Sequence, residues 1–317
     1  MFDFHEFSAI KIDDLILLNR QEILEYIKNN QILFKDLVLD FSPLRHTAYG
    51  HNQLGHLVKI SYKNDLVQKI VIVKNKSHIN RVKMVIAYDG SQFHGFQFQS
   101  KQRTVQGELN KVIQPMIGSN VLIQGASRTD AGVHAYGQVI HFDTNLLLSP
   151  EQWKDILNHQ LPKDIYVKEV SMEHLLFHSR YDVCKKTYVY KIHLGPYDPL
   201  LANYYHFDQN LNVEAMRQAL KILEGRHDFS SFSKSKVDDP MREIFHTSIE
   251  VKDNIIRLEI VGNGFLRYMV RLIVDYLIKI GKDQAKLSML DVLKEKSRKY
   301  TNSIAPAQAL YLDKIEY

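Results

Sequence analysis

The stretch RVKMVIAY, residues 81–88, opens the part of the chain whose element order decides the fold. Its apolar and polar side chains alternate, which is the period of a β-strand with one buried face. The elements predicted after it are a helix at 104–117, strands at 121–125 and 137–143, a helix opening at Ser149-Pro150, and a strand at 165–170. This first set has the order βαββαβ.

The same order recurs in the rest of the chain. The second set consists of a strand at 186–194, a helix at 212–225, strands at 243–251 and 255–261, helices at 265–281 and 286–296, and a strand at 309–317. Two tandem βαββαβ units predict two ferredoxin-like halves around a central, mainly antiparallel sheet with a cleft, and the class α+β.

The first 80 residues differ in pattern from the remainder. Their spacing predicts an amphipathic helix over 12–30, and LVKISY with VQKIVIVK predicts a hairpin around Lys63-Asn64-Asp65. We therefore divide the chain into three parts, which are a small N-terminal α/β extension at 1–80, a first half at 81–182 and a second half at 183–317.

Composition bounds the class of protein. The 317 residues carry 41 Lys+Arg, 36 Asp+Glu and a single cysteine, Cys184. One cysteine excludes an internal disulfide framework and fits a reducing compartment such as the cytoplasm. No run approaches the ~18–20 apolar residues of a membrane span, and the N-terminus MFDFHEF does not resemble a signal peptide. The net charge of +5 permits a polyanionic partner without demanding one.

Several common catalytic motifs are absent from the sequence. It contains no GxxxxGK[ST], HExxH, GxSxG or CxxC, and its GNG at 262–264 lacks the third glycine of a dinucleotide fingerprint. The 15 histidines show no metal-ligand spacing. ATP hydrolysis, hydride transfer and zinc-dependent hydrolysis therefore have no support.

The loop ASRTDAGVHA, residues 126–135, is the first candidate for chemistry. Arg128 and Asp130 are two residues apart, so they would share a side in extended backbone. A carboxylate near a guanidinium stays ionised and available as a nucleophile. From spacing alone, a turn that Asp130 caps while Arg128 pairs with it is the more common arrangement.

Two further groups of basic residues invite alternative interpretations. Arg180, Lys186 and Tyr188 belong to a segment that interleaves cations with aromatic rings, as RNA contact requires, although a half-buried edge strand has the same pattern. Arg267 and Arg271 lie at i and i+4 on the predicted helix. They are either surface side chains or a means of reaching a carboxylate.

Seven segments occur in a fixed order between residues 81 and 317. They are YDGSQFHGFQFQ, RTVQGEL, SRTDAGVHAYGQVIHFDT, FHSRYDVCKKTYVYKI, HDFSSF, GNGFLRYMVRLIV and IAPAQALYL. Together they resemble the TruA-type family of tRNA pseudouridine synthases, and the RTDAGVHA segment is highly specific. The resemblance implies an isomerase that converts uridine to pseudouridine in the anticodon stem-loop of tRNA, at positions 38, 39 and 40.

The resemblance also implies roles for individual residues. Asp130 matches the aspartate that forms a covalent intermediate, and Arg271 matches the basic residue that pairs with it. Tyr188 matches the tyrosine that stacks on the target base, and Arg128 an arginine associated with base flipping. We expect Arg180 and Lys186 to contact the substrate as well. The implied enzyme uses no cofactor or metal and works in the cytoplasm as a homodimer on tRNA.

Some features depart from the family pattern or leave other classes open. Ser127 and Ala309 stand where glycine is common in the family, and residues 1–80 have no counterpart in its pattern. That extension is an RNA-contacting module, a dimerisation element or a remnant of an upstream reading frame. A non-catalytic RNA-binding protein with tandem ferredoxin-like units is the alternative, although no RNP1-like segment is present. A carboxylate-dependent nucleoside hydrolase is a third possibility.

Overall fold

The computed structural model describes residues 47–51, 57–63, 66–73, 79–118 and 121–317, with side chains from residue 79 onward. These residues divide into two units. The first unit contains the described residues up to Lys83, together with His141–Leu148 and Ser171–His178. The second unit contains Met84–Ile140, Ser149–Val170 and Ser179–Tyr317.

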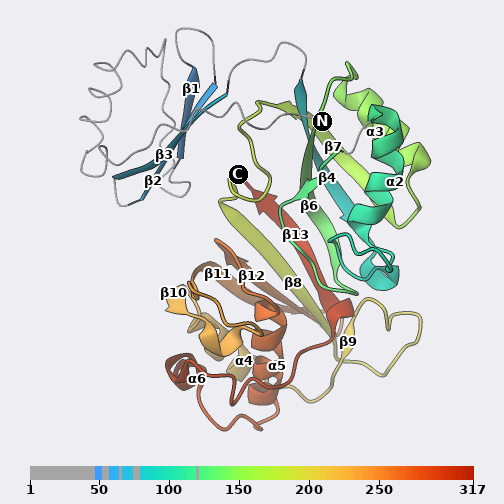
Figure 1. Ribbon diagram of the computed structural model, residues 1–317. Helices are drawn as coiled ribbons and strands as arrows, with labels where there is room; N and C mark the ends of the chain where they lie inside the picture. The colour runs from blue at the N-terminus through green and yellow to red at the C-terminus, as the bar shows by residue number, and fades with distance from the viewer. Residues whose placement is uncertain (1–46, 52–56, 64–65, 74–78, 119–120) are drawn as a thin grey trace. The chain divides into compact units, whose positions relative to one another are not determined.

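The N-terminal part of the first unit contains a small antiparallel sheet of order β1-β2-β3 (Figure 1). Its strands are β1 (Thr47–His51), β2 (Leu57–Lys63) and β3 (Leu66–Val73). The β2–β3 pair confirms the predicted hairpin, and β1 was not predicted. The helix expected at 12–30 lies outside the described residues.

Ion pairs hold the remaining segments of the first unit together. Arg81 donates to both carboxylate oxygens of Asp143, from Nε at 2.6 Å and from Nη2 at 2.7 Å. Lys83 Nζ lies 3.1 Å from Glu173 Oε1. These contacts join three stretches that are far apart in the sequence.

A large mixed sheet contains the strands that follow β3 (Figure 1). Its order is β10-β11-β12-β8-β13-β6-β4-β7, with β5 paired to β6 and β9 paired to β8. The strands of the first half are β4 (Asn80–Tyr88), β5 (Gln124–Gly125), β6 (His134–Thr144) and β7 (Ile165–Glu173). Those of the second half are β8 (Lys185–His193), β9 (His206–Phe207), β10 (Gly225–Asp228), β11 (Met241–Lys252), β12 (Ile255–Gly262) and β13 (Leu310–Glu316).

Strand β13 joins the two halves of the sheet. It pairs antiparallel with β8 and parallel with β6, where Tyr311 faces His134 and Leu312 faces Ala135. The C-terminal strand therefore lies between the strand that follows the Asp130 loop and the strand that carries Tyr188.

Five α-helices belong to the described part of the chain. They are α2 (Val105–Ile117), α3 (Pro150–Gln160), α4 (Val213–Lys221), α5 (Met269–Gly281) and α6 (Met289–Glu295). Short 3-10 turns are η1 (Gly90–Gln92), η2 (Ser230–Phe232) and η3 (Ala307–Ala309). The predicted start at Ser149-Pro150 is confirmed, because Ser149 and Gln152 form a reciprocal capping box.

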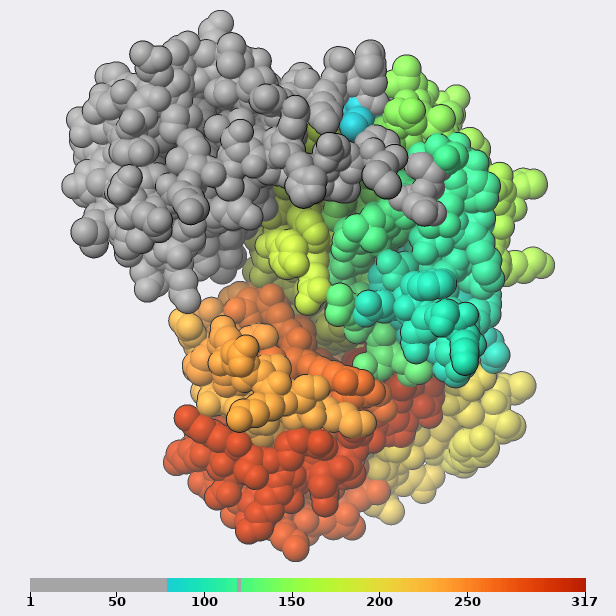
Figure 2. All heavy atoms as spheres, in the orientation of Figure 1, coloured from blue at the N-terminus to red at the C-terminus, as the bar shows by residue number. Residues whose placement is uncertain are grey.

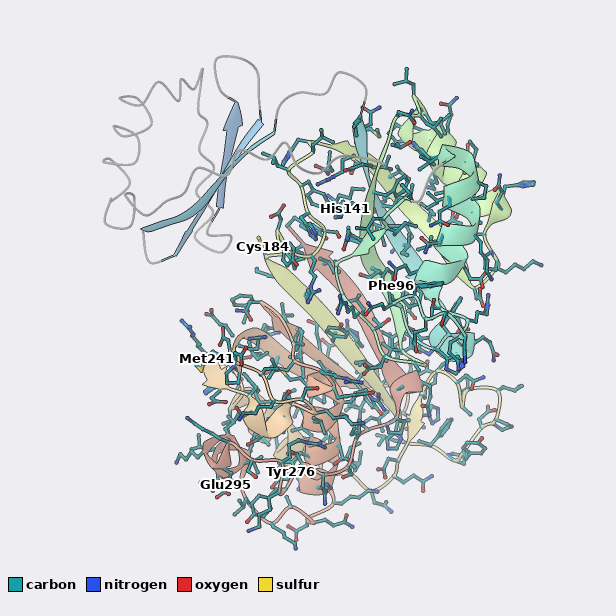
Figure 3. All side chains as sticks on the ribbon, viewed as in Figure 1. Phe96, His141, Cys184, Met241, Tyr276 and Glu295 are labelled. Carbon is teal, nitrogen blue, oxygen red and sulfur yellow. The ribbon has the colours of Figure 1, made fainter. Side chains whose placement is uncertain are left out.

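Large apolar side chains fill the layer between the sheet and the helices. Helices α4 and α5 pack against each other, and Figure 3 shows Tyr276 of α5 among the side chains of this region. Trp153, Tyr190, Tyr276 and Phe142 are the largest fully buried side chains. Because cores pack at near-crystalline density, the packing of α5 against α4 holds α5 in a fixed position.

The structure corrects several predicted boundaries. The strand expected at 121–125 shrinks to Gln124–Gly125, while β6 begins at His134, inside the predicted loop. Helix α4 ends at Lys221, and Gly225 opens strand β10 instead of closing the helix. Helix α5 begins at Met269, because Tyr268 has a left-handed backbone with φ of 62° and cannot continue a right-handed helix.

Candidate active site

The loop with Asp130, residues 126–133 between β5 and β6, is held by the segment that follows β4. Phe96 N donates to Thr129 O at 3.1 Å, and Gly132 N donates to Phe93 O at 3.2 Å. Gly95 makes the approach possible, since its φ is 89° and a Cβ there would lie 2.7 Å from Thr129 O. The loop is thus fixed on both sides of Asp130.

A buried glutamine fixes the start of the same loop. Gln138 is fully buried, accepts from Ser127 N at 3.1 Å, and donates to Ser127 O at 2.7 Å. Tyr88, buried on β4, shares a 2.7 Å hydrogen bond with Thr129 Oγ1. Because these buried polar groups are satisfied only in this arrangement, they oppose any change of the loop backbone.

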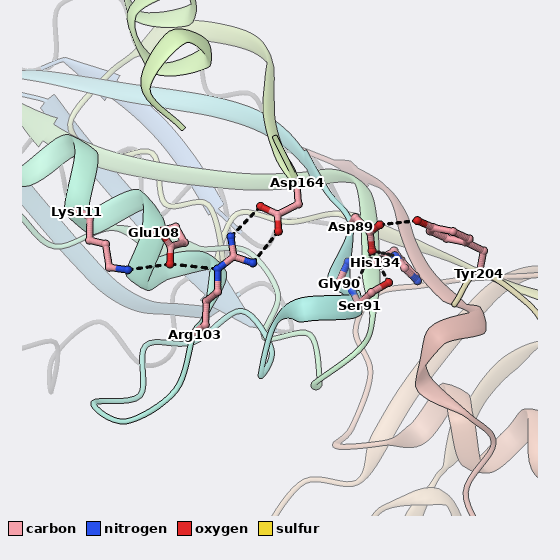
Figure 4. A network of polar contacts seen from close by, with 9 residues as sticks. All are labelled: Asp89, Gly90, Ser91, Arg103, Glu108, Lys111, His134, Asp164 and Tyr204. Carbon is pink, nitrogen blue, oxygen red and sulfur yellow. Dashed lines mark hydrogen bonds and ion pairs between the residues drawn. The ribbon is translucent and has the colours of Figure 1, made fainter. Parts of the chain in front are cut away.

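The end of the loop is held at His134, which is buried at the start of β6 (Figure 4). Its Nδ1 accepts from Gly90 N at 3.1 Å, and its Nε2 lies 2.9 Å from Asn203 O, to which a protonated Nε2 donates. Asp89 lies 3.2 Å from Nδ1, but burial lowers the pKa of His134, so the ring is neutral and this contact is no ion pair. Tyr204 donates to Asp89 at 2.8 Å.

Asp130 pairs with Arg271 of helix α5. Arg271 Nη1 lies 3.3 Å from Asp130 Oδ2, and Arg271 Nε donates to Ala305 O at 2.7 Å. The exposed fraction of the two side chains is 24% for Asp130 and 14% for Arg271. The backbone carbonyl of Ala305 orients the guanidinium, so the cation meets the carboxylate in one geometry.

Two opposing effects set the protonation of Asp130. Burial raises the pKa of this carboxyl above its ordinary value, and the positive charges of Arg271, Arg267 and Lys234 lower it in part. A carboxylate that is partly desolvated and balanced by cations is a better nucleophile than one in water.

Tyr188 stands next to the loop on strand β8. Its hydroxyl shares a 2.8 Å hydrogen bond with Ser127 Oγ, and its ring meets Phe265 edge-on at 5.1 Å between centroids. Burial raises the pKa of Tyr188 to about 12, against the opposite effect of the Ser127 bond. The phenol therefore stays protonated at neutral pH and can donate a hydrogen bond.

The other expected residues differ in their surroundings. Arg128 is exposed and forms no ion pair with another described residue, so the arrangement in which it pairs with Asp130 is absent. Arg180 is exposed, with its guanidinium 5.8 Å from the Tyr181 ring centre. Lys186 Nζ donates to Ala126 O at 2.8 Å, and burial, with the charges of Arg180 and Arg242, lowers its pKa to about 8.

Sequence reasoning missed the residues that support this site. Ser127, Gln138 and Phe265 touch the loop or Tyr188, but nothing in their spacing marks them. The signal for Ser127 was only a departure from a family glycine. Arg267 was paired with Arg271 by helical spacing, yet it precedes α5 and is exposed. Such contacts follow from strand pairing, which brings together residues distant in sequence.

Other kinds of site have no counterpart in the described residues. Among the residues whose placement is described, no group of three His, Cys, Asp or Glu side chains could hold a metal ion. No described helix is long and apolar enough to cross a membrane.

Comparison with known proteins identifies the family. A family model described as tRNA pseudouridine synthase matches residues 84–182 and 219–317, which contain Asp130 and Arg271. The chain belongs to the tRNA pseudouridine synthase family. Its second matched segment begins beyond Tyr188, although that residue lies beside the loop of the first segment.

Relatives within this family cover most of the same region. A protein of Geobacillus sp. (strain WCH70) named tRNA pseudouridine synthase A is 44% identical over 243 residues, covering 75% of this chain and 98% of the relative. The proteins of the same name from Anoxybacillus flavithermus and Geobacillus kaustophilus are 41% and 42% identical, each over 75% of this chain and over 99% and 94% of their own lengths. The chain therefore contains nearly the whole length of these relatives and an additional part.

Proposed function

We propose that this protein isomerises uridine to pseudouridine at positions 38, 39 and 40 in the anticodon stem-loop of tRNA. Family membership supports the reaction, and the ion pair between Asp130 and Arg271 beside Tyr188 is the observation that carries the assignment of the site. The three side chains come from a loop, a helix and a strand that the sheet brings together.

In the proposed reaction, Asp130 is the nucleophile that forms a covalent bond with the substrate. The N1–C1′ bond of uridine breaks, the base turns, and a C5–C1′ bond forms. The bond to Asp130 breaks before the product leaves, which restores the carboxylate. The proton on C5 leaves and N1 gains one, so the product is an isomer of the substrate and no oxidant or cofactor is consumed. Arg271 keeps Asp130 ionised, and Tyr188 stacks on the base and assists proton transfer.

The target uridine must leave the base stack before Asp130 can reach it. Extrusion costs a few kcal/mol, which contacts with the protein offset. Arg128 is exposed on the loop of the nucleophile, where it can fill the place of the extruded base. We assign Arg180 to contact with the RNA backbone. Lys186 supports the loop through Ala126 O, and its remaining N–H groups are assigned to the substrate.

We also propose that the sheet consists of two ferredoxin-like halves with boundaries at 81–182 and 183–317. The arrangement β5-β6-β4-β7 in the first half repeats as β11-β12-β8-β13 in the second. In each half the first strand lies between the third and the fourth, and the family model matches one segment in each half. We propose a homodimer in the cytoplasm, in which residues 1–80 form a separate part.

Replacing Asp130 with Ala tests the proposed function. The expected result is loss of tritium release from tRNA labelled at C5 of uridine, with the thermal unfolding midpoint retained. Asp313→Ala is the matched control, because Asp313 also lies near an arginine, 4.0 Å from Arg257 Nη2. Retained tritium release in Asp130→Ala overturns the assignment of the nucleophile.

The same assay separates the other classes. A non-catalytic RNA-binding protein binds tRNA without forming pseudouridine at any enzyme concentration. A nucleoside hydrolase releases free uracil from the labelled tRNA. Nucleoside analysis of the digested product distinguishes all three outcomes.

A further inference from the structure

Asp130 is surrounded by more positive charge than it can neutralise. Arg271, Arg267 and Lys234 all act on its carboxylate, yet only Arg271 is within ion-pair distance. Arg267 and Lys234 are exposed, and neither forms an ion pair with another described residue. Two positive charges beside the nucleophile are therefore left without an acidic partner.

These two cations are held in place by a tyrosine with an unusual backbone. Tyr268 has a φ of 62°, which non-glycine residues rarely adopt, and directly precedes helix α5. Its ring centre lies 4.8 Å from Lys234 Nζ and 5.2 Å from the guanidinium carbons of both Arg267 and Arg271. One aromatic ring thus contacts all three cations.

A backbone hydrogen bond joins the two segments that supply the exposed cations. Lys234 N donates to Arg267 O at 3.2 Å, which ties the loop between η2 and β11 to the start of α5. The part of the chain that contains this loop, coloured from gold to orange, is visible on the face of the molecule in Figure 2. The two charges are therefore presented to solvent at a fixed place next to Asp130.

Backbone strain at functional sites is retained when the surrounding contacts require it. Here the strained residue gathers like charges, which costs stability unless a ligand compensates. A nucleic acid brings one negative phosphate for each nucleotide, and most protein contacts to it are made by Lys and Arg to phosphate oxygens. A nucleotide whose base reaches Asp130 places its own phosphates nearby.

We propose that Lys234 and Arg267, supported by Tyr268, bind a backbone phosphate adjacent to the target uridine and so position the extruded nucleotide over Asp130. The inference rests on the proposed function for the identity of the RNA. The proposal gives the loop between η2 and β11 a direct part in holding the substrate, although this loop lies far along the chain from the RTDAGVHA segment.

The test measures tRNA affinity as a function of salt concentration for Lys234→Gln, Arg267→Gln and the double variant. Each lost phosphate contact is expected to reduce the slope of log K against log salt by about one. Lys236→Gln is the matched control, because Lys236 is exposed on the same loop but is not among the charges that act most strongly on Asp130. Lys234→Arg and Arg267→Lys keep the charge and are expected to restore the slope.

A second measurement separates phosphate binding from tuning of the nucleophile. If the two cations serve only to keep Asp130 ionised, the variants shift the acidic limb of the single-turnover rate and leave the salt slope unchanged. That result overturns the proposal, as does a slope that changes equally in Lys236→Gln. Thermal unfolding verifies that each variant is folded.

The outcome is independent of the test of the proposed function. Binding is measured without turnover, so the salt slope can be determined in Asp130→Ala itself. Retained tritium release in that variant contradicts the assigned nucleophile, whereas an unchanged slope in the Lys234 and Arg267 variants contradicts only the phosphate site.

Discussion

At the scale of single residues, the protonation of Asp130 is the feature on which the proposed chemistry depends. Burial raises its pKa, and the charges of Arg271, Arg267 and Lys234 oppose that rise. A catalytic base or nucleophile works best when it is ionised at the working pH but poorly solvated. The site combines a half-buried loop with several cations, which satisfies both conditions.

The first prediction at this scale concerns Arg271→Gln. In the proposed reaction the rate requires ionised Asp130, so activity is expected to fall as pH falls through the folded-state pKa of this carboxyl. Removing the charge of Arg271 raises that pKa further, so the acidic limb of kcat/KM moves to higher pH. A pH–rate profile of both proteins measures the shift.

Arg257→Gln provides the control for that experiment, because Arg257 is paired with Glu259 at 2.8 Å. The acidic limb of its kcat/KM profile is expected at the same pH as in the unsubstituted protein. If the limb of Arg271→Gln also stays in place, Arg271 does not set the protonation of Asp130.

The same pKa shift has a consequence for stability. Folded Asp130 binds protons more tightly than unfolded Asp130, because its pKa is raised on folding. The free energy of unfolding therefore falls as pH rises from the unfolded to the folded pKa. The ionised nucleophile is kept at a cost in stability, as is common for functional groups.

At the scale of elements, the loop at 126–133 is rigid because its neighbours approach it at backbone level. Gly95 allows the close approach next to Asp130. Gly90 allows an even closer one at the end of the loop, since a Cβ at Gly90 would lie 2.1 Å from Val133 O. Tight backbone contact on both sides of a short loop leaves little freedom at Asp130, the proposed nucleophile. Positioning within a fraction of an ångström matters for rate.

We predict that Gly95→Ala lowers kcat/KM by more than the loss of folded protein that its backbone strain causes. The new Cβ would meet Thr129 O at 2.7 Å and displace the carbonyl next to Asp130. Gly118→Ala is the matched control, since Gly118 also has a positive φ, of 73°, but no atom lies within 4 Å of its Cβ position.

Both alanine variants pay about 1–2 kcal/mol for a left-handed backbone. Only Gly95→Ala is expected to lose activity beyond that expected from the folded fraction. Thermal unfolding and initial rates on tRNA check both quantities. Equal activity in the two variants contradicts a positioning role for the Gly95 contact.

At the scale of the whole molecule, β13 determines which residues form the site. By pairing with β6 on one side and β8 on the other, it sets the loop of Asp130 beside Tyr188. The segments that the family model matches, 84–182 and 219–317, contain both Asp130 and Arg271. The N-terminal strands β1–β3 form a sheet of their own.

We predict that deleting residues 1–78 leaves kcat/KM for tRNA unchanged. The truncated protein retains Arg81 and Lys83, whose ion pairs with Asp143 and Glu173 join segments of the first unit. A longer deletion that also removes Arg81 and Lys83 is the matched control and is expected to lower the thermal unfolding midpoint. Loss of turnover on removal of 1–78 alone indicates that the extension takes part in the reaction.

The order of the longer strands and helices was predictable because it depends on local patterns, whereas the short strands β1, β9 and β10 were not predicted. Alternation along β4 and β12, and the cap at Ser149, each require only neighbouring residues. The start of α5 was predicted too early, at residue 265. The apolar pattern includes Phe265 and Leu266, but the left-handed backbone at Tyr268 delays the start of the helix to Met269. The short strand β5 was overestimated for the same reason, because apolar residues at 121–123 resemble a strand.

The sequence by itself determined the family, the element order and the loop that carries Arg128 and Asp130, because motifs and periodicities are properties of contiguous residues. The family resemblance already implied that Arg271 pairs with Asp130. Only the tertiary structure shows how two side chains 141 residues apart come to lie 3.3 Å from each other, and that Arg128 does not pair with Asp130. It also decided that Lys234 and Arg267 meet over Tyr268. The physical reason is that strand pairing and core packing fix distances between distant segments, and charges interact according to distance and burial.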